Sequence, residues 1–174
     1  MSLPLVLIPG LMCDARLFWP QIVALSGVTS VQIAPITGAD TVEALAAEVL
    51  ENAPPVFALA GLSMGGIVAM EVLRQAPSRV ARLALMDTNS QAEMPSVAAA
   101  REPQIARVRA GRLEEVMRDE MKRNYLAPGP QRFEVLELVM DMAHALGPEV
   151  FVRQSRALQR RPDQQATLRK ARQP

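Results

Sequence analysis

The sequence has 174 residues, of which 49% are hydrophobic and 21% charged, a balance typical of a folded domain and not of a disordered chain. The formal net charge is only +1, so nothing indicates a strongly basic surface that would bind nucleic acid. The single cysteine, Cys13, excludes a disulfide within the chain and a multi-cysteine zinc site, and the single histidine, His144, excludes a histidine-rich metal site.

The first residues, MSLPLVLIPG, are apolar, but no basic stretch precedes them and no small-residue cleavage pattern follows. No run of about 18 apolar residues occurs anywhere in the sequence, so we expect no membrane span. The sequence therefore predicts a cytoplasmic protein with no membrane attachment, no nucleic-acid partner and no metal.

The first half of the sequence alternates between apolar runs and amphipathic stretches. Leu3 to Ile8 is a near-continuous apolar run ended by Pro9 and Gly10, as expected for a strand that is buried on both faces of a parallel sheet. Similar runs predict strands over residues 28–36, 56–62 and 80–86, and the segments between them predict helices near 18–25, over 40–53 and over 65–75. This alternation predicts the α/β class, with a parallel sheet of about four strands.

The helix predicted after residue 40 has clear signals at both ends. Asp40 and Glu43 stand three positions apart, as in a capping box, and should begin the helix. Pro54 and Pro55 should end it, because proline cannot continue the hydrogen-bonding pattern.

The second half of the sequence is typical of helices alone, with breaks at Gly111, 128–130, 147–148 and Pro162. The charge also changes, from four basic and seven acidic residues in 1–89 to 15 basic and 11 acidic residues in 90–174. We therefore predict two units, a core over residues 1–92 and a helical cap over residues 93–174. The basic stretch from Arg153 onward predicts a solvated helix face, and contact with an acidic partner is the alternative.

The motif Gly61-Leu62-Ser63-Met64-Gly65-Gly66 follows a predicted buried strand and opens a predicted helix. This is the G-x-S-x-G pattern of a nucleophile elbow, in which the serine turns sharply from strand to helix. Only hydrogen fits at Gly61 and Gly65 in such a turn, and Gly66 should let the helix approach the sheet. The alternative is a glycine-rich turn whose serine only caps the helix.

A second loop, Pro9-Gly10-Leu11, directly follows the first predicted strand. An acyl-transfer site needs backbone N–H groups that point at the developing oxyanion. The candidate donors are the N–H of Leu11 in this loop and the N–H of Met64 after the serine. The alternative for the loop is an ordinary turn that ends a strand.

Together, LVLIPGLMCDARLFWPQ and GLSMGGIVAMEVL resemble the α/β-hydrolase fold superfamily, especially its small bacterial serine hydrolases and esterases. The resemblance covers residues 3–89, and residues 95–173 look like the helical cap of such enzymes. It implies a Ser63 nucleophile, an oxyanion hole made by Leu11 and Met64, and no metal or organic cofactor. It also implies that Met12 and Trp19 line the pocket, although Trp19 in plain core is the alternative.

The resemblance further implies an acid and a histidine that follow the cap in chain order. The sequence stops where the strand before that acid should begin, so we expect a truncated chain that is weak or inactive alone. His144 falls on a predicted cap helix and is not expected to serve as the base. Asp87, at the end of the strand over 80–86, is the candidate acid, and turn hydrogen bonding is its alternative role.

The function implied is hydrolysis of a small carboxylic ester or related acyl substrate. Carbon–carbon bond hydrolysis and perhydrolysis are alternative chemistries on the same scaffold. The chain is then a fragment of a serine hydrolase, one part of a split enzyme, or a non-catalytic protein that binds a ligand or partner. The strand over 80–86 would form an exposed edge for self-association or for a second polypeptide.

Overall fold

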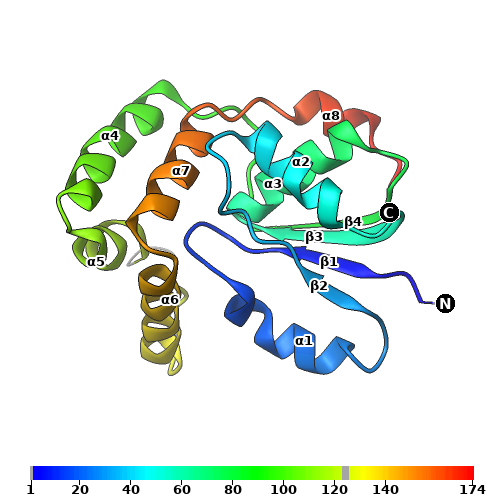
Figure 1. Cartoon of the computed structure of the whole chain (residues 1–174), viewed down its shortest axis with the longest axis horizontal. Coiled ribbons are helices and arrows are strands. Elements are labelled where there is room, and N and C mark those ends of the chain that lie inside the picture. The colour runs from blue at the N-terminus through cyan, green and yellow to red at the C-terminus, as the bar shows by residue number, and fades with distance from the viewer. Residues whose placement is uncertain (1, 123–125) are drawn as a thin grey trace.

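The structure is a computed structural model that describes residues 2–122 and 126–174 (Figure 1). Within those residues one parallel sheet has four strands in the order β2-β1-β3-β4. The strands are β1 (Leu5–Ile8), β2 (Val31–Ile33), β3 (Phe57–Leu62) and β4 (Val80–Met86). The predicted α/β class and the parallel sheet of about four strands are confirmed.

Strand β2 is much shorter than the predicted run over residues 28–36. At its start, the N–H groups of Val28 and Thr29 both donate to the carbonyl of Leu25 at 2.9 Å and close a turn. At its end, Pro35 has no N–H to contribute to a ladder. The strand predicted from the β-branched residues of this segment was therefore too long.

Helices cover the two faces of the sheet unequally (Figure 1). The short 3₁₀ helix η1 (Ala15–Phe18) and α1 (Trp19–Leu25) lie on one face, over a small cluster of Leu7, Phe18 and Ala60. Helices α2 (Val42–Asn52) and α3 (Met64–Gln75) lie on the other face. That face carries the main core, with side chains such as Ile8, Leu45 and Val68 fully or almost fully buried.

The N-terminus of α2 differs from the prediction. Thr41, in extended backbone, is the N-cap, and its hydroxyl accepts from the N–H of Ala44 at 3.2 Å. The predicted capping box of Asp40 and Glu43 was therefore wrong by one residue, and Asp40 instead lies 3.6 Å from Arg160. The helix ends at Asn52, before the proline pair, as expected.

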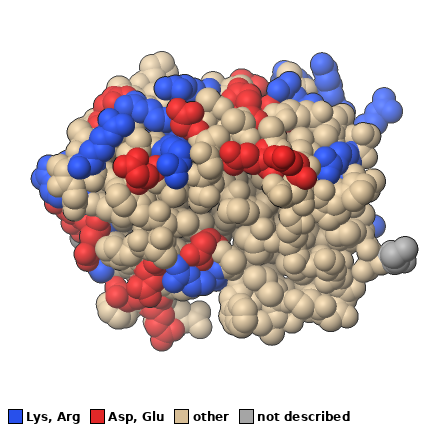
Figure 2. Space-filling model, in the orientation of Figure 1, with Lys and Arg blue, Asp and Glu red and all other residues tan. Residues whose placement is uncertain are grey.

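The helices of the predicted cap lie beyond the carboxyl ends of the strands (Figure 1). These cap helices are α4 (Pro95–Arg109), α5 (Leu113–Glu115), η2 (Val116–Lys122), α6 (Arg132–Leu146) and α7 (Pro148–Gln159). Gly111 and Gly147 have φ near +82° and +81°, which only glycine adopts readily, and they mark the ends of α4 and α6. Figure 2 shows charged side chains of both signs gathered over this region, whereas the surface over α1 and β2 is nearly free of them. None of the helices in the described ranges combines the length and apolarity needed to cross a bilayer.

The last part of the chain returns to the core. Helix α8 (Gln165–Lys170) packs against α3, and the N–H of Leu83 in β4 donates to the carbonyl of Pro174 at 3.1 Å. The segment predicted as cap over residues 93–174 thus includes a final stretch that lies on the core. Strand β4 is an edge of the sheet within the described residues, and association through it stays a prediction.

The basic stretch from Arg153 is only partly a solvated face, so that prediction was wrong in part. Arg153 Nε donates to the carbonyl of Thr37 at 2.8 Å, and Arg156 forms an ion pair with Glu102. Only 11% of the Arg161 side chain is exposed. These arginines attach α7 and the segment after it to the rest of the molecule.

Candidate active site

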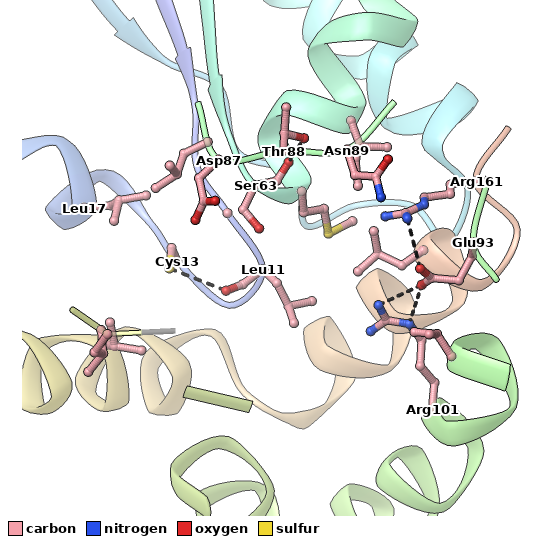
Figure 3. Close-up of a pocket in the computed structure, with 18 of the residues that line it drawn as sticks. Leu11, Cys13, Leu17, Ser63, Asp87, Thr88, Asn89, Glu93, Arg101 and Arg161 are labelled. Atoms are coloured by element: carbon pink, nitrogen blue, oxygen red, sulfur yellow. Dashed lines mark hydrogen bonds and ion pairs between the residues drawn. The ribbon is translucent and has the colours of Figure 1, made fainter. Parts of the chain in front are cut away.

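Ser63 lies between the last residue of β3 and the first residue of α3, with φ 53° and ψ −116°. A residue with a side chain is strained in this conformation, at a cost of about 1–3 kcal/mol. Backbone contacts hold it there, because its N–H donates to Met86 O at 2.9 Å and its carbonyl accepts from Thr88 Oγ1 at 2.7 Å. The Ser63 side chain makes no capping hydrogen bond, so the alternative of a simple helix cap was wrong. The hydroxyl instead faces a cavity (Figure 3).

The three glycines of the motif are required by close contacts. A Cβ on Gly61 would lie 2.3 Å from the carbonyl oxygen of Gly65, inside the elbow itself. A Cβ on Gly65 would lie 2.1 Å from the carbonyl oxygen of Ile8, so this glycine is the one that brings the helix against the sheet. Gly66, predicted to have that role, instead faces the side chain of Thr88, 2.7 Å from where its Cβ would be.

The loop after β1 is held by a side chain from the cap. Met12 has φ 53°, and its N–H donates to Gln154 Oε1 at 2.8 Å. Gln154, on α7, is completely buried and its Nε2 donates to the carbonyl of Ile36 at 2.9 Å. This one amide therefore joins the loop after β1, the loop after β2 and the cap. No local pattern in the sequence predicts this contact, because Gln154 lies 142 positions from Met12.

Both candidate oxyanion donors lie at the same cavity as Ser63. Leu11 and Met64 line the cavity, and Met64 is the first residue of α3. The N–H at the start of a helix has no acceptor within the helix, and the helix dipole there favours negative charge. The structure thus brings together the two predicted donor residues and the predicted nucleophile.

The cavity has a volume of about 550 Å³, and it is lined by residues at the carboxyl edge of the sheet and by residues of the cap. That size is typical of pockets for small molecules. From the core it is lined by Gly10, Leu11, Cys13, Leu17, Leu62, Ser63, Met64, Ile67, Asp87, Thr88 and Asn89. From the cap side it is lined mainly by apolar residues, among them Val97, Leu126, Val135, Val139 and Leu158.

Asp87, the candidate acid, ends up at this cavity. It directly follows β4, has φ 44°, and is exposed at the cavity beside Ser63 (Figure 3). The predicted alternative of turn hydrogen bonding belongs instead to its neighbours, Thr88 and Asn89, whose side chains bond Ser63 O and Gln91 N. Among the described residues, no hydrogen bond or ion pair engages the Asp87 carboxylate.

His144 is not part of this arrangement. It lies on α6, half exposed, with its Nε2 3.9 Å from Glu114 Oε2, and it does not line the cavity. Because it is the only histidine in the sequence, no imidazole of this chain reaches Ser63.

Two predicted pocket residues lie elsewhere. Met12 is fully buried in the main core and does not line the cavity. Trp19, at the start of α1, is 63% exposed and does not line the cavity, so it forms neither pocket wall nor core. Phe18 is the aromatic residue that packs under the sheet. Cys13 lines the cavity, and its thiol donates to Leu11 O at 3.4 Å.

A charged cluster at the cavity was not predicted. Glu93 lies 2.8 Å from Arg101 Nη2 and 3.1 Å from Arg161 Nη2. Burial lowers the pKa of the Arg161 guanidinium; Glu93 opposes that shift, and repulsion from Arg101 adds to it. No local pattern could have revealed the cluster, because its members come from before α4, from within α4 and from after α7.

Comparison with known proteins shows the family and the fold of the chain. A family model described as the thioesterase domain matches residues 20–172. No curated protein matches the chain. A thermophilic esterase from Thermogutta terrifontis, solved with malate bound, is similar over 100% of this chain and 70% of its own, with a TM-score of 0.88 and 26% identity.

Two further solved structures show the same fold. A hydrolase from Pseudomonas aeruginosa has a TM-score of 0.81 at 22% identity and is matched over 99% of this chain and 69% of its own. An enol-lactonase from Burkholderia xenovorans has a TM-score of 0.79 at 21% identity, over 96% of this chain and 68% of its own.

Proposed function

This chain belongs to the thioesterase domain family of the α/β-hydrolases, and on that premise we propose that it is a serine hydrolase with Ser63 as its nucleophile. The observation that supports this most is the strained Ser63 backbone, which presents an exposed hydroxyl at a cavity beside two candidate oxyanion donors. The proposed substrate is a small carboxylic ester, a thioester or a related acyl compound. The similarity to the Thermogutta esterase supports an ester substrate.

In the proposed reaction, Ser63 Oγ attacks the acyl carbonyl carbon and loses its proton to a general base. The N–H groups of Leu11 and Met64 stabilise the oxyanion, helped by the N-terminus of α3. The tetrahedral intermediate then expels the alcohol or thiol, which takes up a proton from the protonated base, and leaves an acyl-serine. Water, deprotonated by the same base, attacks the acyl-serine carbonyl. The bond to Ser63 Oγ then breaks, the protonated base returns its proton to Ser63 Oγ, and the acid is released.

The general base in this proposal is an imidazole. His144, the one histidine of the sequence, does not supply it, because its side chain lies beside Glu114 and does not line the cavity. Removing the histidine of a serine triad costs roughly six orders of magnitude in kcat. We therefore expect the chain alone to react very slowly and to be accelerated by free imidazole, for which the cavity of about 550 Å³ has room. Asp87 would orient the imidazole through its exposed carboxylate.

The test is labelling of the whole chain with a fluorophosphonate, read by intact mass, with and without imidazole. We expect a single adduct that forms much faster with imidazole, is located on Ser63 by peptide mapping, and is absent in Ser63→Ala. The matched control is Ser96→Ala, which removes an exposed hydroxyl on α4 and should label like the wild type.

Two results would overturn the proposal. One is an adduct that persists in Ser63→Ala. The other is a folded wild-type chain that forms no adduct at any imidazole concentration, which would favour a non-catalytic binding protein.

A further inference from the structure

Two arginines and one glutamate form part of the cavity wall opposite the sheet (Figure 3). Glu93 precedes α4, Arg101 lies within α4, and Arg161 follows α7. Arg101 contacts Glu93 Oε2 through Nε at 2.9 Å and Nη2 at 2.8 Å, and Arg161 Nη2 lies 3.1 Å from the other carboxylate oxygen. All three side chains line the cavity that holds Ser63.

The charges of this cluster do not balance. The side chains of Arg101 and Arg161 are only 12% and 11% exposed, and that of Glu93 only 5%. Within the described part of the chain, Glu93 is the only carboxylate paired with either arginine, so one positive charge has no counter-charge. Buried charges in proteins are normally paired. In addition, the Nε of Arg161 is buried and has no hydrogen-bond partner among the described residues.

Asp87 is the fourth charged residue that lines the cavity, and it makes one end of the cavity negative. Asp87 and the arginine cluster lie on opposite sides of Ser63 in the close-up view (Figure 3). Much of the remaining lining is apolar, with Ile67, Val97 and Leu158 as examples. An anionic group on a bound molecule would therefore be repelled by Asp87 and attracted toward Arg101 and Arg161.

We propose that Arg101 and Arg161 form a subsite for a carboxylate carried by the acyl substrate, remote from the carbonyl that Ser63 attacks. This inference rests on the proposed function and narrows its substrate class to half-esters or half-thioesters of dicarboxylic acids. The guanidinium group suits this role because its planar fork matches the two oxygens of a carboxylate. Glu93 holds both guanidinium groups in place, and the N–H groups that do not bond Glu93 are left to bind the ligand.

A second arginine–glutamate contact shows what a purely structural pair looks like in this chain. Arg156 on α7 pairs with Glu102 on α4, one charge against one, and neither residue lines the cavity. That pair joins α4 and α7 without surplus charge. The Glu93 cluster differs from it in its position at the cavity and in its second arginine.

The test measures binding to the whole chain carrying Ser63→Ala, by isothermal titration calorimetry. The probes are monomethyl glutarate, which carries one carboxylate, and dimethyl glutarate, which carries none. We expect the monoester to bind at least about tenfold more tightly, as charge-assisted bidentate pairs are the stronger ones. Adding Arg161→Gln should remove this preference, and the matched change Arg156→Gln should keep it.

Because Arg161→Gln removes an ion pair and could unfold the chain, Glu93→Gln provides a second test. It removes the competing negative charge while keeping an acceptor oxygen, and we expect it to retain or strengthen the preference for the monoester. Equal affinity for the two esters, or an unchanged preference in folded Arg161→Gln, would overturn the subsite.

Failure of the subsite and failure of the proposed function give different results. A preference for the monoester without any Ser63 adduct would support the subsite and contradict the assignment of Ser63 as the nucleophile. An adduct on Ser63 without a preference would do the reverse.

Discussion

The core and the cap build the cavity by different means. In the core, the strained backbone of Ser63 and the close contacts of Gly61 and Gly65 leave little freedom in the shape of the elbow. In the cap, charged side chains from distant positions in the sequence make the connections, such as Arg161 with Glu93 and Arg156 with Glu102. Close steric contacts therefore set the position of Ser63, the proposed nucleophile, whereas contacts between side chains far apart in the sequence set the charges on the other side of the cavity.

This contrast has an energetic side. A clash with backbone in a packed region has no cheap relaxation, because interiors are as dense as organic crystals. An ion pair with solvent access contributes only about 0–1 kcal/mol. Substitutions in the elbow should therefore lower the free energy of unfolding much more than substitutions in the exposed ion pairs of the cap.

The largest effect is expected at the contact between α3 and β1. Gly65→Ala would place a methyl group 2.1 Å from the carbonyl oxygen of Ile8, and backbone on both sides prevents relief. We expect the free energy of unfolding to fall by about 3 kcal/mol or more. Chemical denaturation of both proteins measures it, with Gly129→Ala as the control, because nothing lies within 4 Å of a Cβ there. Equal unfolding midpoints for wild type and Gly65→Ala would show that this contact is not what limits substitution in the elbow.

The next effect lies where the two regions meet. Gln154→Leu would leave the Met12 N–H and the Ile36 carbonyl buried without a partner, each at about 1–3 kcal/mol. We expect a loss of roughly 2–3 kcal/mol in unfolding free energy. We also expect slower imidazole-assisted labelling of Ser63, because the loop after β1, which carries the proposed donor Leu11, is no longer held. The matched change on the same helix, Gln159→Leu, should spare the labelling. If both variants label like the wild type, Gln154 has only a structural role.

A smaller effect is expected where the chain returns to the core. Glu71 on α3 is fully buried; burial raises the pKa of its carboxyl, but hydrogen bonds from Arg74, Gln75 and Gln164 outweigh this and hold it below its ordinary value. A lowered pKa stabilises the fold at neutral pH, and the stabilisation disappears as the pH falls through the folded-state pKa. We expect Glu71→Gln to lose roughly 2 kcal/mol of unfolding free energy at neutral pH and less in acid. Denaturation across that pH range checks this, and a pH-independent loss would contradict it.

Much of the fold was open to prediction because its signals are local. The buried runs predicted every strand of the described sheet, and the glycines around Ser63 predicted a turn that cannot carry a side chain at Gly65. The strand boundaries at β2 were wrong because β-branched residues such as Val28 also occur in turns. The N-cap was wrong by one residue because Asp40 and Thr41 are both good capping residues, and only the backbone conformation distinguishes them.

The rest could not be predicted because it depends on contacts across long distances in sequence. Nothing near Arg161 indicates that it pairs with Glu93, and nothing near Gln154 indicates a bond to Met12. Trp19 shows the opposite failure, since this large aromatic residue was predicted to line the pocket or lie in the core and is exposed instead. Burial of a single side chain depends on which element packs over it, and that information is not local.

The buried amide of Gln154 also limits how the cap can be exchanged. A designer who wished to change substrate preference could replace α4 to α6 by other helices, because they meet the cavity mostly through apolar side chains and ion pairs. Helix α7 is different, because its Gln154 bonds the loops after β1 and β2. Chimeras that graft a foreign cap would therefore need to keep α7 as part of the recipient scaffold, with the junctions placed at Gly147 and after Gln159.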